Sequence, residues 1–163
     1  MEMHFASVWE TISDHIPDEP ALICDDNIKS WKEYEDRAAK LANFLHEKSI
    51  TNNSKVGLYL HNSNEYLEAQ FATFKLEGVP INVNYRYVEE ELIYLLDNSD
   101  SEVVFFQNSY AERIKKIADQ LPNIKAYIQV GGKELLDLEN CYMYEEIISQ
   151  NPPLERKTRS EDN

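Results

Sequence analysis

The sequence predicts an α/β fold with a mostly parallel sheet, helices on both of its faces, and a short β-hairpin near the start. Apolar runs of strand length alternate along the chain with segments whose apolar residues recur every three or four positions. The 163 residues and the hydrophobic content of 42% suit one domain that buries a core of its own.

The first thirty residues predict a helix followed by a hairpin. Apolar residues at spacings of three and four run from Phe5 to Ile12, which is typical of a short amphipathic helix. Residues 21–24 and 28–29 read as two strands on either side of the turn at 25–27. Because the turn is so short, the two strands are predicted to be antiparallel.

The next segment carries the clearest helix signal in the chain. Ser30 and Glu33 form a capping box, in which the hydroxyl accepts an exposed backbone N–H and the carboxylate reaches back to the cap. An apolar stripe at helical spacing follows from Trp31 to Leu45, with charged residues on the opposite side. We therefore expect a long amphipathic helix here.

The rest of the chain alternates between strand and helix. Predicted strands cover residues 56–60, 79–83, 102–106 and 124–130, and predicted helices cover 64–77, 88–96, 110–121 and 143–149. Gly78 is expected to end its helix in the left-handed conformation, and Gly131-Gly132 to form a turn. Pro80 requires that its missing N–H is not needed in the sheet.

These elements predict one domain over residues 1–150 and a tail behind it. Asn151-Pro152-Pro153 interrupts the alternation, and the residues that follow are almost wholly polar and charged. We interpret residues 151–163 as a flexible tail or linker.

Charge and composition exclude several partners. The formal net charge of −14 is unsuited to nucleic acid or to an anionic membrane surface, because both require clustered Lys and Arg. No apolar run is long enough to span a membrane, and the start lacks a signal-peptide pattern. Cys24 and Cys141 lie far apart and are expected to be thiols. We expect a cytoplasmic protein.

Few residues are arranged for chemistry. The four glycines cannot form a phosphate-binding loop, the four histidines show no metal-binding spacing, and the cysteines have no base beside them. We therefore expect no catalytic residue, no metal and no cofactor for this chain alone. Tyr34, Tyr66 and Tyr94 fall at helical core spacings, so most of the ten tyrosines are predicted to pack in the interior.

One polar segment stands apart, because it follows directly from a predicted strand. The outgoing ends of parallel strands are the usual ligand-binding side of an open sheet, and Asn84 and Arg86 occupy that position. A structural interpretation is equally open: Asn84 would cap the next helix, and Arg86 would pair with Glu89 or Glu90. His61 also follows a strand, either as a ligand contact or as a structural histidine.

Five short segments resemble a known family when they are taken in order. Residues 17–22 read Pro-Asp-Glu-Pro-Ala-Leu, 30–34 read Ser-Trp-Lys-Glu-Tyr, and 55–63 end in Asn-Ser. Residues 74–87 contain Glu-Gly-Val-Pro-Ile-Asn-Val-Asn-Tyr-Arg-Tyr, and Glu-Leu follows at 91–92. This series resembles the N-terminal subdomain of the AMP-forming acyl-CoA synthetases of the adenylate-forming superfamily, and most of all their fatty-acid–CoA ligase branch.

The resemblance implies a two-step reaction for the complete enzyme. A carboxylic acid is activated by ATP, with Mg²⁺, to acyl-AMP, and the acyl group then passes to CoA. The family's phosphate-holding loop, which ends in Pro-Lys-Gly, and its later motifs are missing from this sequence. The resemblance thus implies that residues 1–150 are an incomplete subdomain and that this chain alone is catalytically incompetent. It also implies that Arg86 lies near the phosphates of CoA.

Two hypotheses follow for the role of this chain. In the first, the chain is part of an acid–CoA ligase, through a truncated reading frame or an excised piece, and its uncovered face meets the remainder of the synthetase or self-associates. In the second, it is a non-enzymatic interaction module that docks on a complete synthetase. A nucleotide-binding protein unrelated to ligases is disfavoured by the missing glycine loop.

Overall fold

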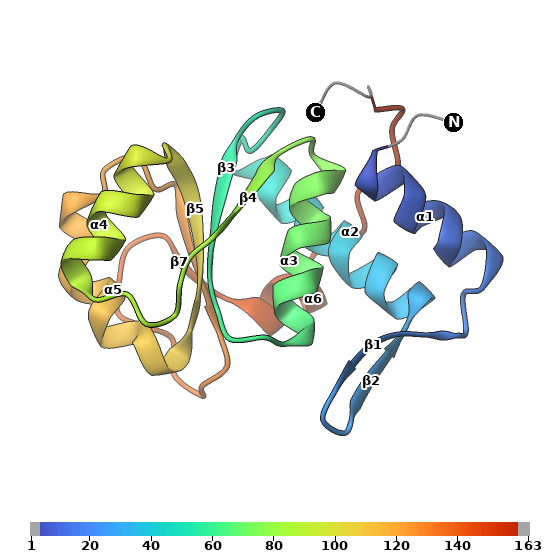
Figure 1. The fold of residues 1–163 in the computed structure, drawn as a ribbon, viewed down its shortest axis with the longest axis horizontal. Helices are drawn as coiled ribbons and strands as arrows, with labels where there is room; N and C mark the ends of the chain where they lie inside the picture. The colour runs from blue at the N-terminus through green and yellow to red at the C-terminus, as the bar shows by residue number, and fades with distance from the viewer. Residues whose placement is uncertain (1–3, 160–163) are drawn as a thin grey trace.

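The computed structural model describes residues 4–159 and has an α/β architecture (Figure 1). Its elements in chain order are α1 (Phe5–His15), β1 (Pro20–Cys24), β2 (Asn27–Ser30), α2 (Trp31–Glu47), β3 (Lys55–Tyr59), α3 (Asn64–Lys75), β4 (Val79–Asn82), α4 (Glu89–Asn98), β5 (Ser101–Gln107), η1 (Asn108–Tyr110), α5 (Ala111–Ile117), η2 (Ala118–Gln120), β6 (Ala126–Val130), β7 (Cys141–Met143) and α6 (Tyr144–Gln150).

The predicted fold class is confirmed. Five strands form one parallel sheet in the order β4-β3-β5-β6-β7, while β1 and β2 form a separate antiparallel hairpin. Helices α2, α3 and α6 cover one face of the sheet, and α4 and α5 cover the other (Figure 1). Helix α1 and the hairpin lie beyond α2 and α3, at the end of the molecule farthest from α4.

Both faces of the sheet are buried, which explains the continuous apolar runs in the sequence. Along β5, Val103 and Phe105 join the core under α2, α3 and α6, while Val104 and Phe106 join the core under α4 and α5. Successive side chains of a strand point to opposite faces, so a strand covered on both sides needs an apolar residue at every position.

The capping box at the start of α2 is confirmed. The backbone N–H of Glu33 donates to the Ser30 hydroxyl at 3.2 Å, and the N–H of Ser30 donates to the Glu33 carboxylate at 2.8 Å.

The third apolar core, between α1, α2 and α3, is aromatic: the Trp9 ring lies 5.9 Å from that of Tyr34 and 5.1 Å from that of Phe71, between centroids.

Three details differ from the sequence prediction. Strand β7 was not predicted, because its three residues are too short an apolar run to indicate a strand. The helix predicted over 110–121 is α5 flanked by two 3₁₀ turns. The left-handed residue after α3 is Glu77, with φ of 59°, and not Gly78. Space at Gly78 is tight, since a Cβ atom there would lie 3.1 Å from the Ser54 carbonyl oxygen.

Pro80 sits where its missing N–H costs nothing. Strand β4 is an edge strand that pairs only with β3, and the N–H groups of Val79 and Val83 donate to Ser54 and Leu58 on that side. The backbone nitrogen of Pro80 therefore points to the unpaired side of β4, where no N–H is needed, as the sequence required.

A buried ion cluster joins helices α1, α2 and α3. The Lys75 ammonium group donates to Glu10 and to Glu35, each at 2.7 Å, and Arg159 donates to both carboxylate oxygens of Glu10 at 2.7 and 3.0 Å. Burial alone would raise the pKa of Glu10, but Arg159 and Lys75 outweigh it and hold that pKa below its usual value of 4.5. Lys75, Arg159 and Glu10 are all buried, so each charge depends on its partners.

Residues 151–159 contain neither helix nor strand, yet they are bonded to the helices. The N–H of Leu154 donates to the carbonyl oxygen of Ala39 at 3.0 Å, and the Arg156 guanidinium binds Asp14 at 2.8 Å. The segment is thus attached to the helices at residues 154 and 156 before it reaches Arg159, which belongs to the ion cluster. The domain limit at residue 150 and the flexibility of the tail stay predictions, and residues 160–163 of that tail lie outside the described residues.

The ion cluster predicts how stability depends on pH. Replacing Glu10 by Gln should lower the free energy of unfolding at neutral pH by about 3 kcal/mol, because two buried cations lose their shared anion. A depressed carboxyl pKa stabilises the fold above the unfolded pKa, and this contribution is lost as pH falls through the folded value. Urea unfolding at several pH values should show the native chain losing stability below pH 4.5, and the variant losing less.

The matched control is Glu139→Gln, because that carboxylate is exposed. Its stability should stay within about 0.5 kcal/mol of the native chain. If the free energy of unfolding falls equally with pH in the native chain and in Glu10→Gln, Glu10 is not the source of the acid sensitivity.

Candidate functional site

The structure brings the predicted site residues together at one edge of the sheet. His61 follows β3, and the turn of residues 84–87 follows β4, so parallel pairing places both at the carboxyl ends of neighbouring strands. The rings of His61 and Tyr85 lie 5.2 Å apart between centroids. Tyr110, just beyond β5, joins them through a 2.8 Å hydrogen bond between its hydroxyl and Nε2 of His61.

Asn84 shapes the turn that carries Arg86. Its side-chain oxygen accepts the backbone N–H of Arg86 at 3.0 Å, and its carbonyl oxygen accepts the N–H of Tyr87 at 3.0 Å. The alternative that Asn84 caps the next helix is wrong. At the start of α4 it is the Glu91 carboxylate that accepts the N–H of Val88, at 3.0 Å.

The Arg86 side chain is exposed. Within residues 4–159 its guanidinium makes no ion pair, and it lies 5.5 Å from the centroid of the neighbouring Tyr85 ring. The alternative pairing with Glu89 or Glu90 is wrong, because Glu89 faces Lys116 at 3.4 Å and Arg113 at 3.9 Å instead.

Sequence reasoning missed the tyrosines and the arginine beneath this turn. Tyr59 is buried, its ring centroid lies 4.5 Å from that of Tyr110, and its hydroxyl donates to the carbonyl oxygen of Tyr87 at 2.9 Å. Arg113 of α5 donates to the same carbonyl oxygen at 2.9 Å and to the Tyr59 hydroxyl. Their positions in the sequence could have indicated them, since Tyr59 is the last residue of β3 and Tyr110 lies three residues after the end of β5.

The prediction that tyrosines at helical spacings pack inside holds only in part. Tyr34 is buried and Tyr66 packs against the core, whereas 70% of Tyr94 is exposed.

Burial raises the pKa of Tyr59, although Arg113 opposes the shift, and burial also raises the pKa of Tyr110. Both phenols therefore stay protonated at neutral pH.

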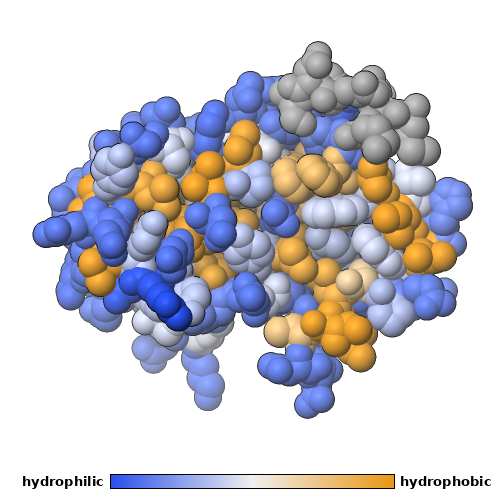
Figure 2. Space-filling model, in the orientation of Figure 1, coloured by the Kyte–Doolittle hydropathy of each residue, from blue (hydrophilic) through white to orange (hydrophobic). Residues whose placement is uncertain are grey.

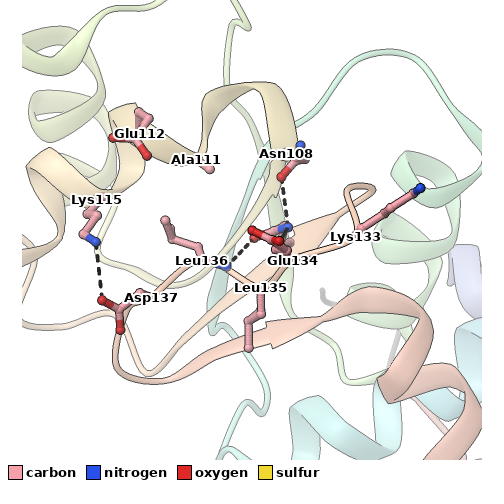
Figure 3. Close-up of a pocket in the computed structure, with 10 residues that line it drawn as sticks. Asn108, Ala111, Glu112, Lys115, Lys133, Glu134, Leu135, Leu136 and Asp137 are labelled. Carbon is pink, nitrogen blue, oxygen red and sulfur yellow. Dashed lines mark hydrogen bonds and ion pairs between the residues drawn. The ribbon is translucent and has the colours of Figure 1, made fainter.

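A pocket of about 510 Å³ opens at the same edge, beyond β5 and β6 (Figure 3). The buried Gln129 organises it, since its side chain donates to Asn108 at 3.0 Å and accepts the N–H of Leu136 at 2.9 Å. Lys115 points towards Asp137, at 3.6 Å, and Lys133 extends away from the pocket centre (Figure 3).

The predicted turn at Gly131 and Gly132 is confirmed, and it leads from β6 into the wall of this pocket. Both residues have positive φ, and a Cβ atom at Gly132 would lie 2.5 Å from the side-chain oxygen of Asn108. The turn therefore requires glycine for conformation and for space.

The described residues offer binding groups more than reacting groups. Burial raises the pKa of Cys141 to about 11, which leaves its thiol protonated, and Cys24 is also free. Between residues 4 and 159, no three His, Cys, Asp or Glu side chains are grouped as metal ligands. Over the same range no helix is long and apolar enough to cross a membrane.

With the fold and this edge described, comparison with known proteins defines the family. The sequence pattern of the family described as AMP-binding enzyme matches residues 9–163, so the chain belongs to that family. This confirms the resemblance read from the short segments.

Several of the curated relatives are CoA ligases. The chain is 33% identical over 155 residues to 3-oxocholest-4-en-26-oate–CoA ligase of Rhodococcus rhodochrous, a match over 94% of this chain and 28% of that protein. It is 37% identical over 128 residues to a medium/long-chain-fatty-acid–CoA/3-oxocholest-4-en-26-oate–CoA ligase of Mycobacterium marinum, over 78% of this chain and 23% of the relative. The chain thus spans less than a third of the length of these relatives.

Solved structures share the fold. The anthranilate CoA ligase in complex with anthranoyl-AMP superposes with a TM-score of 0.87 at 19% identity, over 95% of this chain and 29% of that one. Coronafacic acid ligase from Pectobacterium brasiliense gives a TM-score of 0.86 at 17% identity, over 96% and 31%. The chain therefore has the fold of the N-terminal part of adenylate-forming ligases.

The unpaired state of Arg86 predicts that this side chain is dispensable for folding. Arg86→Ala should change the free energy of unfolding by less than about 0.5 kcal/mol, because no buried contact or ion pair is lost. Urea unfolding measures this, with Arg37→Ala as the contrasting variant, since Arg37 binds the buried carboxylate of Glu68 at 2.9 Å. A large loss for Arg86→Ala would mean that the turn depends on the side chain.

Proposed function

We propose that this chain is the N-terminal subdomain of an AMP-forming acid–CoA ligase, with fatty-acid-like acids as substrates of the complete enzyme, and that it does not catalyse the reaction by itself. One observation carries the proposal: the family match runs over residues 9–163, yet the chain spans only 28% of its Rhodococcus rhodochrous relative.

Within this function the exposed edge supplies a contact for CoA. Arg86 offers a permanently charged guanidinium with several donors, which suits phosphate oxygens. Asn84 fixes the turn from within, and His61 contributes an exposed ring beside it. A single exposed arginine–phosphate contact is worth only about 1 kcal/mol, so this chain alone should hold CoA weakly.

The adenylation step needs groups outside the described edge. In the complete enzyme, the acid carboxylate would attack the α-phosphorus of ATP and displace pyrophosphate, and Mg²⁺ would help to neutralise the charge of that crowded phosphate. The described residues do not fit this task, because they contain neither a glycine-rich loop nor an acidic cluster for Mg²⁺.

The first test is acid-dependent exchange between ATP and pyrophosphate. The purified chain should show no exchange above background with fatty acids, because the residues that would hold the triphosphate are missing from its sequence. The Rhodococcus rhodochrous ligase, assayed with the acid in its name, serves as the positive control. Clear exchange by the chain would overturn the proposed incompetence.

The partner of this subdomain is proposed to be the remainder of a synthetase or a second copy of the chain. Apolar side chains gather over the hairpin and along the α1 side in the space-filling view (Figure 2). Ile23 and Ile28 are opposite each other in the hairpin, and 70% and 56% of their surfaces are exposed. Exposed apolar surface of this kind favours association.

Association can be measured by sedimentation velocity over a range of concentrations. The chain should self-associate, and a double Ile23→Thr, Ile28→Thr variant should do so less, since threonine keeps the β-branch of the strand residues. Tyr94→Thr, on the opposite side of the sheet, is the control. A strictly monomeric native chain would favour the second hypothesis, an interaction module that docks on a complete synthetase.

A further inference from the structure

We propose that Tyr59 and Arg113 are positioning residues, which hold the turn of residues 84–87, and with it Arg86, at the exposed edge of the sheet. What the turn binds rests on the proposed function. How the turn is held rests on contacts within the chain.

The first support is the placement of Tyr59. It is the last residue of β3 and is fully buried, so its ring is fixed by the core under α4 and α5. Its hydroxyl emerges beneath the turn, 2.9 Å from the carbonyl oxygen of Tyr87 and 3.4 Å from that of Tyr85. The phenol has one proton, so it donates mainly to the nearer carbonyl oxygen, that of Tyr87, which directly follows Arg86 in the chain.

The second support comes from another element. Arg113 of α5 donates through one nitrogen, Nη1, to the Tyr59 hydroxyl and to the Tyr87 carbonyl oxygen. Its Nε faces Glu89 at 3.9 Å, and its guanidinium carbon lies 5.7 Å from the centroid of the Tyr110 ring. Because Nη1 is committed to Tyr59 and Tyr87 and only 29% of the side chain is exposed, Arg113 suits positioning of the turn.

Two apolar contacts also hold the turn, since the Tyr85 ring lies 5.2 Å from the His61 ring and Tyr87 packs against the core under α4 and α5. The bonds from Asn84 to the N–H groups of Arg86 and Tyr87 lie within the turn and set its shape, but not its place on the sheet. Across residues 4–159, the hydrogen bonds from other elements to residues 84–87 are those of Tyr59 and Arg113. Removing them should let the turn move as a unit while the sheet stays intact.

Amide hydrogen exchange tests this with Tyr59→Phe, which deletes one oxygen and keeps the ring. Exchange of the Arg86 and Tyr87 amides should become about tenfold faster, because one or two hydrogen bonds of ordinary strength are lost. Amides of β5 should keep their rates. Tyr127→Phe is the matched control, since among the described residues the Tyr127 hydroxyl is buried in the same core with no hydrogen-bond partner.

Variants of Arg113 separate positioning from general stability. Arg113→Met should reproduce the faster exchange at Arg86 and Tyr87, while Arg113→Lys, which keeps a charged donor, should recover most of the protection. If the turn amides keep their rates in Tyr59→Phe and Arg113→Met, or if all amides speed up in proportion, the proposal is overturned.

A binding experiment uses adenosine 3′,5′-bisphosphate, which resembles the phosphate-bearing nucleotide end of CoA. Its titration should shift the Arg86 amide signal, and binding should weaken severalfold in Tyr59→Phe and not in Tyr127→Phe. Equal binding by all three proteins would overturn the positioning role in binding. If the native chain shows no shift, the CoA contact of the proposed function fails, and the exchange rates still decide how the turn is held.

Discussion

The parallel alignment of β3, β4 and β5 is the constraint on which the candidate site depends. Residues far apart in the chain meet at one edge only because every strand runs in the same direction. His61, the turn at residues 84–87 and Tyr110 each leave a strand at that edge, and none of them is close to the others in sequence. The sheet thus acts as the scaffold, and the loops beyond it carry the polar groups.

Helix α1 is held by charged groups as well as by the aromatic core that it shares with α2 and α3. A buried ammonium and a buried guanidinium would be costly alone, and the shared Glu10 carboxylate makes both tolerable. The cluster thereby links the first helix to residue 159, at opposite ends of the described chain. Removing one member of such a cluster is costly, since it leaves a buried charge without its partner, whereas apolar residues of equal volume can stabilise as well as the whole cluster.

Much of the fold was accessible from sequence, because it rests on local patterns. Alternating apolar periodicity identified the sheet and its covering helices, and the Ser30–Glu33 spacing located the start of α2. The edge position of Asn84, Arg86 and His61 followed from the rule that ligands approach the carboxyl ends of strands.

What could not be predicted depends on contacts between distant residues. Tyr59 and Arg113 are 54 positions apart, and neither has a local pattern that distinguishes it from a core tyrosine or a helix-surface arginine. Strand β7 has only three residues and pairs with β6, a contact that the short local pattern does not indicate. The positive φ of Glu77, directly before Gly78, has no local sequence signal, because glycine is the residue that usually adopts it.

Pro80 has a consequence for the growth of the sheet. In β4 the N–H groups of Val79 and Val83 point inward to β3, so the outward-facing positions between them are Pro80 and Asn82. Proline has no N–H, which leaves Asn82 as the outward amide donor of this strand. A foreign strand approaching from this side would find one rung of the ladder missing, so this border of the sheet is a poor template for intermolecular β-pairing.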